Sequence, residues 1–585
     1  MRRSCSSLLP SCIPSRSSHF TLDSSAPILA ILLTCLLLCA SPLVAQQAPE
    51  LVTQAVDNSI RTVLPGNVHP LARAQNDLGE APSDLALHRM LLVLKRSPQQ
   101  ETVLRGLIDD QQDKHSASYH QWLAPEEFGA RFGIADSDLA AVTNWLTASG
   151  FQVTQVNKGR TIVEFSGTAS LVKQYFGTAI HQYGVKGEKY WANSSNPSIP
   201  TALTPVVQGF ASLNNFPRQA YHTVSGPLTD NYHGGDGPLP LFTFSFNGTE
   251  HYGVGPSDFA TIYNVQPLWT AGIDGTGQTI AIVGETNINI QDIRDFRSMF
   301  GLPAKDPQIM VEGPDPGILQ DGEETEAVAD VSWSGAVAKN ATIDFVVSES
   351  TETTSGIDLS AIYIIDQNLA PVMSESYGFC EAGLGGYNGF YYYLWEQAAA
   401  QGISVMISAG DAGSAGCDNF DTESVSQFGL AVSGYASTPF NVAVGGTDFD
   451  QTPSTASTYW SSTNATGTGE SAKSYVREMT WNDSCAAFGL TGCTPGNSDF
   501  FDIVGGSGGQ SSCAFQDSTG TICTGGYAKP SWQTGTGVPN DGVRDLPDVS
   551  LFAGDGENGS FYILCQSDQV SPCSLNPVSF VSVGG

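Results

Sequence analysis

The strongest constraint on the fold is a series of short apolar runs in the second half of the chain. Most are bounded by Gly, Ser or Asp, and they lie at 279–286, 343–350, 371–378, 403–411 and 441–447. Segments 323–337 and 391–402, which lie between runs, have helical character. Strands that alternate with helices predict an α/β fold with a parallel sheet and helices on both faces. In such sheets the active site lies beyond the carboxyl ends of the strands, where we expect Asp411.

The first half of the chain has a different pattern. It predicts a strand at 88–96, helices at 99–115 and 132–150, a strand–turn–strand at 151–167 and a short helix at 169–177. This alternation favours an α+β, ferredoxin-like split βαβ sandwich. The segment that follows, 221–251, is rich in Gly and Pro and indicates a linker.

Charge divides the chain at the same place. Residues 1–220 carry 17 Lys and Arg and 16 Asp and Glu, whereas residues 221–585 carry 8 and 42. The net charge of −33 argues against nucleic-acid binding, because a phosphate backbone would be repelled. The acidity of the second half either serves solubility alone or suits a protein that works in acid, where protonation reduces the self-repulsion.

The N-terminus has the pattern of a targeting segment. An apolar run at 26–45 follows Arg2, Arg3 and Arg16 and closes on small residues. This pattern predicts a secretory signal peptide, with a permanent membrane anchor as the alternative. No later stretch is apolar enough to span a bilayer. We therefore expect a secreted protein without a stable anchor.

The cysteines agree with export. Four of the twelve lie in the signal region and the other eight follow residue 379. An even number in an exported chain indicates disulfides. Proximity in sequence predicts the pairs 485–493, 513–523 and 565–573, which leaves 380–417. A zinc site is the alternative, but no CxxC occurs and no His clusters with these cysteines.

Three acidic residues are candidates for chemistry. Glu326 and Asp330 are four apart in a helical segment with few basic residues, so their carboxyls project from one face. Two like charges there are destabilising unless they share a proton or serve a purpose, and the alternative is a solvated acidic face. Asp411 follows an apolar run among small residues, which also fits an Asx turn or cap.

Other motifs are weaker. Gly505–Gly509 matches G-x-S-x-G around Ser507, but a nucleophile elbow needs a helix after it, and a loop-like sequence follows. The glycine-rich GIDGTGQTIAI segment precedes a strand instead of following one, which argues against nucleotide binding. The nine histidines form no HExxH.

Taken together, these segments resemble the sedolisin (kumamolisin-like) family of serine-carboxyl peptidases. Segments 118–133 and 166–200 look like the family's activation prodomain. The motifs that look like its catalytic domain follow in the family's order: EAVADV (326–331), PVMSESYG (371–378), SAGDAG (408–413), STPFNVAVGGT (437–447), AKPSWQ (528–533) and RDLPDVS (544–550).

The resemblance implies a domain plan. A signal peptide at 1–45 would precede a ferredoxin-like prodomain at 46–220 and a linker at 221–251 that holds the maturation cleavage. A subtilisin-like catalytic domain, incomplete at its C-terminus, would occupy 252–585.

The resemblance also implies roles for the acidic residues. Glu326 and Asp330 match the Glu and Asp of a Ser-Glu-Asp triad, with Glu326 as general base and Asp330 orienting it. Asp411 matches the oxyanion-hole aspartate, which can donate a hydrogen bond only when it is protonated, so acid favours this step. Glu285 and Tyr377 fall near a secondary network that some members have.

The sequence departs from the family pattern at its end. The family's nucleophile lies in G-T-S-x-x-x-P, and its equivalent of VGG continues directly into Thr-Ser, whereas this sequence ends SFVSVGG at Gly585. We therefore expect the serine and the family's structural calcium site to lie beyond Gly585. Residues 1–585 alone should have no peptidase activity.

The expected function is a secreted acid endopeptidase made as a zymogen and inhibited by its own prodomain. We expect a monomer that acts on proteins or peptides. One alternative is a non-catalytic secreted binding protein on the same scaffold. Another is a subtilisin-like Ser-His-Asp protease, but no histidine in 252–585 lies near a suitable strand end.

Overall fold

The computed structural model describes most of the chain beyond residue 47. The described residues are 48–211, 213–229, 243–246, 249–319, 322–420, 423–452, 454–484, 487, 503–556, 558–568, 573–575 and 578–585. The predicted signal peptide, part of the predicted linker, and Cys485 and Cys493 lie outside these residues. Within them, no helix has both the length and the apolar character needed to cross a membrane.

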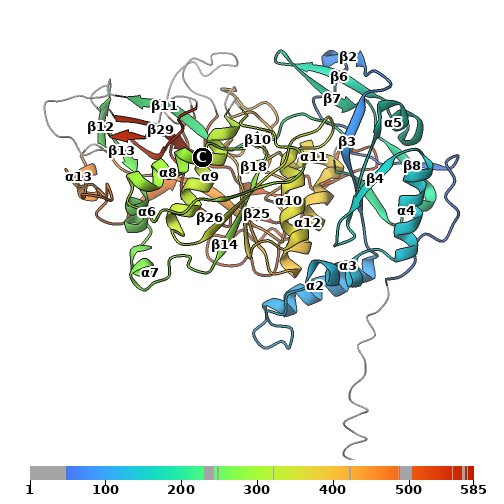
Figure 1. The fold of residues 1–585 in the computed structure, drawn as a ribbon, viewed down its shortest axis with the longest axis horizontal. Helices are drawn as coiled ribbons and strands as arrows, with labels where there is room; N and C mark the ends of the chain where they lie inside the picture. Colours follow the sequence, from blue (N-terminus) through green and yellow to red (C-terminus); the bar gives the residue numbers. More distant parts are fainter. Residues whose placement is uncertain are drawn as a thin grey trace, which may run out of the picture. The chain divides into compact units, whose positions relative to one another are not determined.

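An eight-stranded sheet organises the second half of the chain (Figure 1). Its order is β15 (Gln308–Val311), β16 (Thr342–Val347), β14 (Thr279–Gly284), β17 (Val372–Glu375), β19 (Ser404–Ser408), β20 (Val442–Phe449) and β21 (Glu478–Thr480), with β26 (Val549–Phe552) also beside β20. All neighbours are parallel except β20 and β21. The predicted α/β parallel sheet is confirmed.

Helices cover both faces of this sheet because successive side chains of a strand point to opposite faces. In β14, Ala281 and Val283 pack with α10 (Gly356–Gln367) and α12 (Asn388–Ala400). Ile282, between them, packs on the other side with α8 (Ile290–Met299) and α9 (Glu323–Val337).

A second, six-stranded sheet includes both the predicted linker and the last residues of the chain. Its path is β11 (Thr223–Thr229), β29 (Val578–Gly584), β27 (Ser560–Leu564), β13 (Thr249–Val254) and β12 (Thr243–Phe246), and β28 (Ser574–Leu575) also pairs with β29. Thr223 lies opposite Gly584 in antiparallel register. The predicted linker therefore contains strands, and its beginning runs beside Gly585.

The N-terminal half is built on a four-stranded antiparallel sheet. Its order is β4 (Gln152–Val156), β5 (Ile162–Thr168), β3 (Ala86–Leu94) and β9 (Val207–Phe210). Numbered along the chain, this is second, third, first, fourth, which is the predicted split βαβ arrangement. Its connections hold α2 (Pro98–Gln112), α3 (Pro125–Phe132), α4 (Asp136–Ala148) and α5 (Ala169–Phe176).

Smaller elements complete the described residues. The paired strands are β1 (Arg61–Val63) with β8 (Ser198–Pro200), β6 (Ile180–Val185) with β2 (Asp77–Glu80) and β7 (Glu188–Asn193), β10 (Gln219–Ala220) with β18 (Tyr377–Gly378), β22 (Gly509–Gln510) with β25 (Asp545–Leu546), and β23 (Phe515–Gln516) with β24 (Cys523–Gly525). The short helices are α6 (Pro256–Ile262), α7 (Gln266–Thr270), α11 (Glu381–Leu384) and α13 (Ala456–Tyr459).

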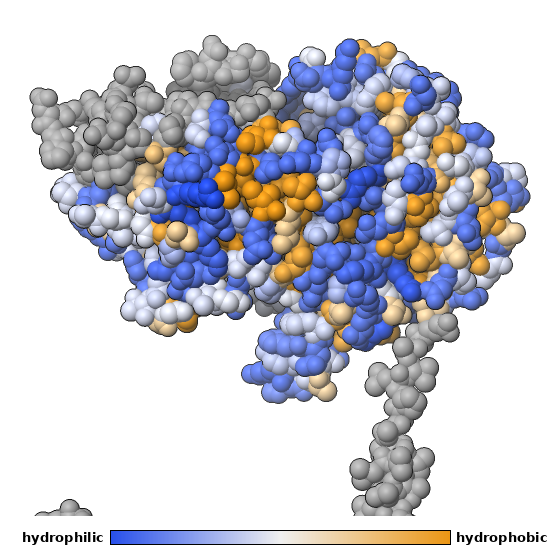
Figure 2. Space-filling view, in the orientation of Figure 1, coloured by the Kyte–Doolittle hydropathy of each residue, from blue (hydrophilic) through white to orange (hydrophobic). Residues whose placement is uncertain are grey.

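The N-terminal sheet packs on α10 and α12, and residues 48–585 form one unit. Leu91 and Val93 of β3 share an apolar cluster with Ile357 and Tyr391. Leu123 also donates a backbone hydrogen bond to the carbonyl of Ala400, at 3.0 Å. Away from this contact, the lobe formed by α2 exposes mostly hydrophilic residues (Figure 2).

Ion pairs join the two halves as well. Arg96 contacts Glu396 in the buried interface. Arg89 lies 3.0 Å from Glu312, and His88 Nδ1 lies 3.0 Å from Glu352. In each pair the basic group comes from the N-terminal half and the carboxyl from the acidic half.

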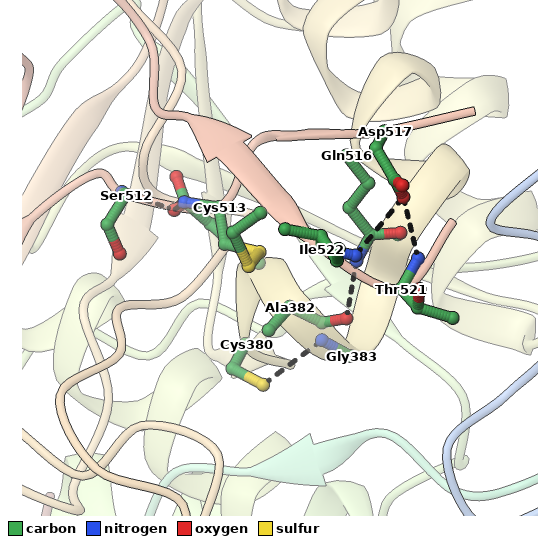
Figure 3. The surroundings of a disulfide bond; sticks show 12 residues. Cys380, Ala382, Gly383, Ser512, Cys513, Gln516, Asp517, Thr521 and Ile522 are labelled. Atoms are coloured by element: carbon green, nitrogen blue, oxygen red, sulfur yellow. Dashed lines mark hydrogen bonds between the residues drawn. A yellow bond between two sulfur atoms is a disulfide. The ribbon is translucent and has the colours of Figure 1, made fainter. Parts of the chain in front are cut away.

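Three of the predicted disulfides are confirmed: Cys380–Cys417, Cys513–Cys523 and Cys565–Cys573. Figure 3 shows how one of these loops is anchored to α11. The amide of Gln516 donates to the Ala382 carbonyl at 3.1 Å, and the Cys513 backbone N–H donates to a Glu381 carboxyl oxygen at 2.8 Å. The pair 485–493 lies outside the described residues and stays a prediction.

Candidate active site

Glu326 and Asp330 lie one turn apart in α9. The helix begins directly after Gly322, whose φ of 94° is a left-handed conformation that glycine adopts most easily. Glu326 is only 4% exposed, and Oδ2 of Asp330 is buried. The two carboxyls therefore do not form a solvated acidic face.

The environment of this pair favours protonation. Burial raises the pKa of Glu326 to about 8, and a hydrogen bond from Ser376 opposes the rise. Burial, together with the neighbouring Glu326 carboxyl, raises the pKa of Asp330 well above its usual value. The Ser376 hydroxyl donates to Asp330 Oδ1 at 2.7 Å, which fixes the carboxyl in place. Two carboxyls this close titrate as a unit that shares protons.

Asp411 lies beyond the carboxyl end of β19, as predicted. It follows Gly410, whose φ is 112°, and it is 3% exposed. Its backbone carbonyl accepts a hydrogen bond from the Gly505 N–H at 2.8 Å. A β-carbon placed on Gly585 would lie 3.0 Å from Asp411 Oδ2, so the last residue of the chain reaches this carboxyl.

The segment 219–222 crosses the site as an extended strand. Gln219–Ala220 pairs antiparallel with Tyr377–Gly378, and the Tyr221 N–H donates to the Ser376 carbonyl at 3.1 Å. An extended peptide that pairs with a strand is held in the same way, by main-chain hydrogen bonds.

The peptide bond between Tyr221 and His222 lies among the acidic residues. A β-carbon on Gly585 would lie 2.5 Å from the Tyr221 carbonyl oxygen and 2.7 Å from His222 Cα. His222 Nδ1 lies 2.9 Å from Glu326 Oε2. The arrangement therefore brings together one peptide bond, the end of β29, Glu326 and Asp411.

Comparison with known proteins shows what the chain is similar to. Residues 74–216 match the model of the pro-kumamolisin activation domain. The chain is 25% identical over 502 residues to sedolisin of Pseudomonas sp. strain 101, which covers 84% of this chain and 75% of sedolisin. It is 25% identical over 529 residues to xanthomonalisin of Xanthomonas sp. strain T-22, which covers 85% of this chain and 57% of that protein. The chain is a relative of the sedolisin and kumamolisin-like peptidases.

Kumamolisin of Bacillus sp. strain MN-32 is also similar, at 24% identity over 337 residues, which are 56% of each chain. This sedolisin relative thus spans three quarters of sedolisin and little more than half of xanthomonalisin and kumamolisin. A solved structure of Pseudomonas sedolisin, described as a serine-carboxyl proteinase complexed with two molecules of pseudo-iodotyrostatin, has 24% identity and a TM-score of 0.38. The similarity covers 54% of this chain and 74% of that chain.

The family resemblance places Tyr377 and Glu285 near a secondary network, and the structure gives the contacts of each. The Tyr377 hydroxyl donates to Glu323 Oε2 at 3.0 Å, in the first turn of α9. Glu285 accepts hydrogen bonds from Ser350 at 2.6 Å and from Ser355 at 3.2 Å. These contacts place Tyr377 beside the start of α9, whereas Glu285 is held by the segment before α10.

Ser507 of the sedolisin relative lies close to Asp411 but does not form a nucleophile elbow. The strand β22 follows it instead of a helix. Its Oγ accepts a hydrogen bond from the Ala412 N–H at 3.0 Å, and the residue is 3% exposed. The serine serves the packing of the loop against Gly410 and Ala412.

Metal-binding side chains do not cluster in the part of the chain that the structure describes. Among the described residues, no group of three or more His, Cys, Asp or Glu side chains is arranged to hold a metal ion. Calcium needs six to eight oxygen ligands. The calcium site that the resemblance implies therefore remains a prediction for residues beyond Gly585, and no chemical step here depends on it.

Sequence reasoning missed three participants in the site of the sedolisin relative: His222, Glu323 and Ser376. His222 lies in the segment interpreted as a linker, and its neighbours carry no strong strand signal. Ser376 lies near the end of the apolar run predicted at 371–378. A polar residue at that position was the available signal. Glu323 was inside the predicted helix, but nothing in the sequence indicated that it would accept a hydrogen bond from Tyr377.

Proposed function

We propose that this protein is the zymogen of a secreted endopeptidase that hydrolyses peptide bonds in acid through a Ser-Glu-Asp triad. The observation that carries the proposal is the extended segment 219–222, whose Tyr221–His222 bond lies beside Glu326, Asp411 and Gly585. Similarity to sedolisin supports the reaction class, and the matched activation domain supports the zymogen.

The proposed nucleophile is a serine that follows Gly585. Its hydroxyl oxygen attacks the carbonyl carbon of the substrate while its proton passes to Glu326, which would act as a carboxylate once segment 219–222 has left the site and the burial that raises its pKa is relieved. Asp330, held by the Ser376 hydroxyl, positions Glu326. The same proton then goes to the leaving amine as the C–N bond breaks, and water hydrolyses the acyl-enzyme by the reverse sequence.

Asp411 is the proposed donor to the tetrahedral oxyanion. A carboxylic acid can donate this hydrogen bond only while it is neutral, so the step requires acid. The proximity of Asp411 Oδ2 to Gly585 supports the assignment, because a serine after Gly585 would bring the reacting carbonyl to the same place.

The prodomain is the proposed intramolecular inhibitor. Its C-terminal residues Gln219–Ala220 pair with β18, and His222, the second residue of the linker, contacts the proposed base Glu326. Basic groups of the prodomain also pair with carboxyls of the acidic half, as in Arg89–Glu312 and His88–Glu352. Acid would loosen the complex before the linker is cut, because carboxyls that become protonated no longer pair with cations of the prodomain.

Export through residues 1–45, a monomeric state and a structural calcium ion beyond Gly585 complete the proposal. The acidity of residues 221–585, with 42 carboxyl residues against 8 Lys and Arg, supports work in acid. The disulfides support an oxidising compartment.

The test is to extend the gene through the sequence that follows Gly585 and to assay the purified protein on a generic peptide. We expect hydrolysis in acid that Glu326→Gln abolishes. Glu349→Gln, which changes an exposed carboxyl, is the matched control and should leave the activity unchanged. A folded, extended protein that binds peptides without cutting them at any pH would instead be a binding protein on this scaffold.

A further inference from the structure

We propose that Asp358 and Glu375, with the surrounding tyrosines, form a subsite for a cationic substrate side chain. The subsite would take Arg or Lys at the third residue before the one whose carbonyl is attacked. This inference rests on the proposed function. It goes beyond that function because it assigns a sequence preference to the enzyme.

The register of segment 219–222 shows which residue each position of a bound substrate would match. Gln219 lies opposite Gly378 and Ala220 opposite Tyr377, and Tyr221 bonds to the Ser376 carbonyl. The Tyr221 carbonyl is the one beside Gly585. A substrate bound through the same main-chain hydrogen bonds would therefore place its third preceding residue where Arg218 lies.

Arg218 occupies a buried acidic pocket. Its side chain is 2% exposed, and Nη2 lies 3.8 Å from Asp358 Oδ2, which is an ion-pair distance longer than a hydrogen bond. The guanidinium carbon lies 5.0 Å from the centre of the Tyr387 ring, in cation–π geometry. The Tyr391 hydroxyl donates to Asp358 Oδ1 at 2.6 Å and orients that carboxylate.

Glu375 adds a second carboxyl to the pocket, beside the ion pair of Arg218 and Asp358. It ends β17 and is 1% exposed, and among the described residues neither of its carboxyl oxygens accepts a hydrogen bond. Burial raises the pKa of both Asp358 and Glu375, and the charge of Arg218 opposes the rise in each. Two carboxyls in a buried space are costly without a cation nearby.

In the sequence, the residues of the pocket follow the proposed maturation site, whereas Arg218, which occupies the pocket, precedes it. Asp358 and Glu375, like Tyr387, Tyr391 and Tyr435, belong to the part that would remain after cleavage. Arg218 belongs to the part that would leave. Its departure would uncover two carboxyls and several aromatic rings, which a guanidinium or ammonium group of a substrate fits.

The experiment compares two peptides that copy the sequence RQAYHTVS from residue 218 and differ only in Arg or citrulline at the first position. Citrulline keeps the shape of Arg and removes its charge. Hydrolysis is measured with the matured, extended protein, and binding is measured by fluorescence anisotropy with its Glu326→Gln variant. We expect kcat/KM and affinity to favour the Arg peptide by about tenfold or more, because only the Arg side chain carries a charge with which the two buried carboxyls can pair.

Variants of the pocket test whether Asp358 and Glu375 cause the preference for the Arg peptide. Glu375→Gln and Asp358→Asn should each reduce the ratio between the two peptides several-fold, whereas the exposed Glu349→Gln should leave it unchanged. If a buried substitution prevents folding, the comparison of the two peptides on the unaltered enzyme still tests whether the enzyme prefers a cationic side chain. Equal kcat/KM and equal affinity for both peptides would overturn the subsite and leave Arg218 as an anchor of the prodomain alone.

The same experiment separates the two proposals. Preferential binding of the Arg peptide without hydrolysis would support the subsite and contradict the peptidase function. Hydrolysis without discrimination would support the peptidase and contradict the subsite.

Discussion

The two halves of the molecule contain carboxyls in opposite environments. In the prodomain, Glu80 pairs with Lys173 at 2.7 Å and Asp77 with His181 at 2.9 Å, and each contact lowers the pKa of its carboxyl. In the acidic half, burial raises the pKa of Asp448 to about 7 and that of Asp483 to about 8. These two prodomain carboxylates are paired at the surface, whereas these two acids of the acidic half are buried.

The difference has opposite consequences for stability. A carboxyl whose pKa is lowered on folding stabilises the fold above its unfolded pKa, and this contribution is lost as the pH falls through the folded value. A carboxyl whose pKa is raised on folding favours the folded state most at low pH. That contribution is lost as the pH rises from about 4 towards the folded pKa of about 7 to 8. Acid should thus weaken the ion pairs of the prodomain, whereas the buried acids of the acidic half favour the folded state most in acid.

The largest effect we expect is on catalysis by the extended protein. Glu326→Gln or Asp330→Asn should each lower turnover by about four orders of magnitude, as loss of a triad member does in other hydrolases. The measurement is turnover on a generic peptide between about pH 2 and 7, with a check that each variant is exported and folded. Turnover near that of the unaltered protein with Glu326→Gln would mean that Glu326 is not the base.

A smaller loss should follow removal of the oxyanion donor. Asp411→Ala should lower turnover by about 10²–10³-fold, the cost of one such donor. Asp411→Asn should cost less and should extend activity towards neutral pH, because an amide donates without needing a proton. An unchanged alkaline limb of the pH profile in the Asn variant would show that Asp411 is not the titrating donor.

The contact of His222 with the proposed base Glu326 should have a moderate effect on activation. His222→Gln removes a titratable partner of Glu326 and keeps a side chain of similar reach. We expect the extended zymogen to mature about tenfold faster at mildly acidic pH, since hydrogen bonds to charged groups contribute about 1.5–3 kcal/mol. Maturation is followed by gel electrophoresis, with the exposed His115→Gln as control. Equal rates for both variants would contradict an inhibitory role of His222.

The smallest effect concerns two buried acids that take no part in the proposed catalytic steps. Asn558 bridges Asp448 and Asp483 at 2.7 and 2.9 Å. Asp448→Asn should raise the unfolding temperature by a few degrees near pH 8 and have little effect near pH 4, as expected for about 1 kcal/mol. The control, Asp306→Asn, removes a surface partner of Arg294 and should not stabilise the protein at any pH. A thermal scan that shows equal gains at both pH values would contradict the account.

The sequence predicted local features well. The runs at 279–286 and 403–411 became β14 and β19, because short apolar runs bounded by small residues have few alternatives in a parallel sheet. The helix predicted at 323–337 coincides with α9, and the three described disulfides close short or strand-end loops. Glu326 and Asp330 were predicted to share a face, and they lie one turn apart in one helix.

The sequence did not predict the contacts between distant segments. The hydrogen bond from Tyr221 to Ser376 and the contact of Arg218 with Asp358 join residues more than a hundred positions apart. A Gly- and Pro-rich stretch gave no sign that Thr223–Thr229 would pair with the last strand of the chain. These features depend on how the prodomain packs on α10 and α12, which no local pattern encodes.

The most direct test of the central claim is to find where the extended zymogen cuts itself. The claim is that segment 219–222 lies in the active site as a substrate would. The purified zymogen is acidified, and the new termini are read by mass spectrometry, with the Glu326→Gln protein treated in parallel. The account predicts a cut between Tyr221 and His222 that is absent from the variant. Cleavage only at other bonds, or equal cleavage in the Glu326→Gln protein, would contradict it.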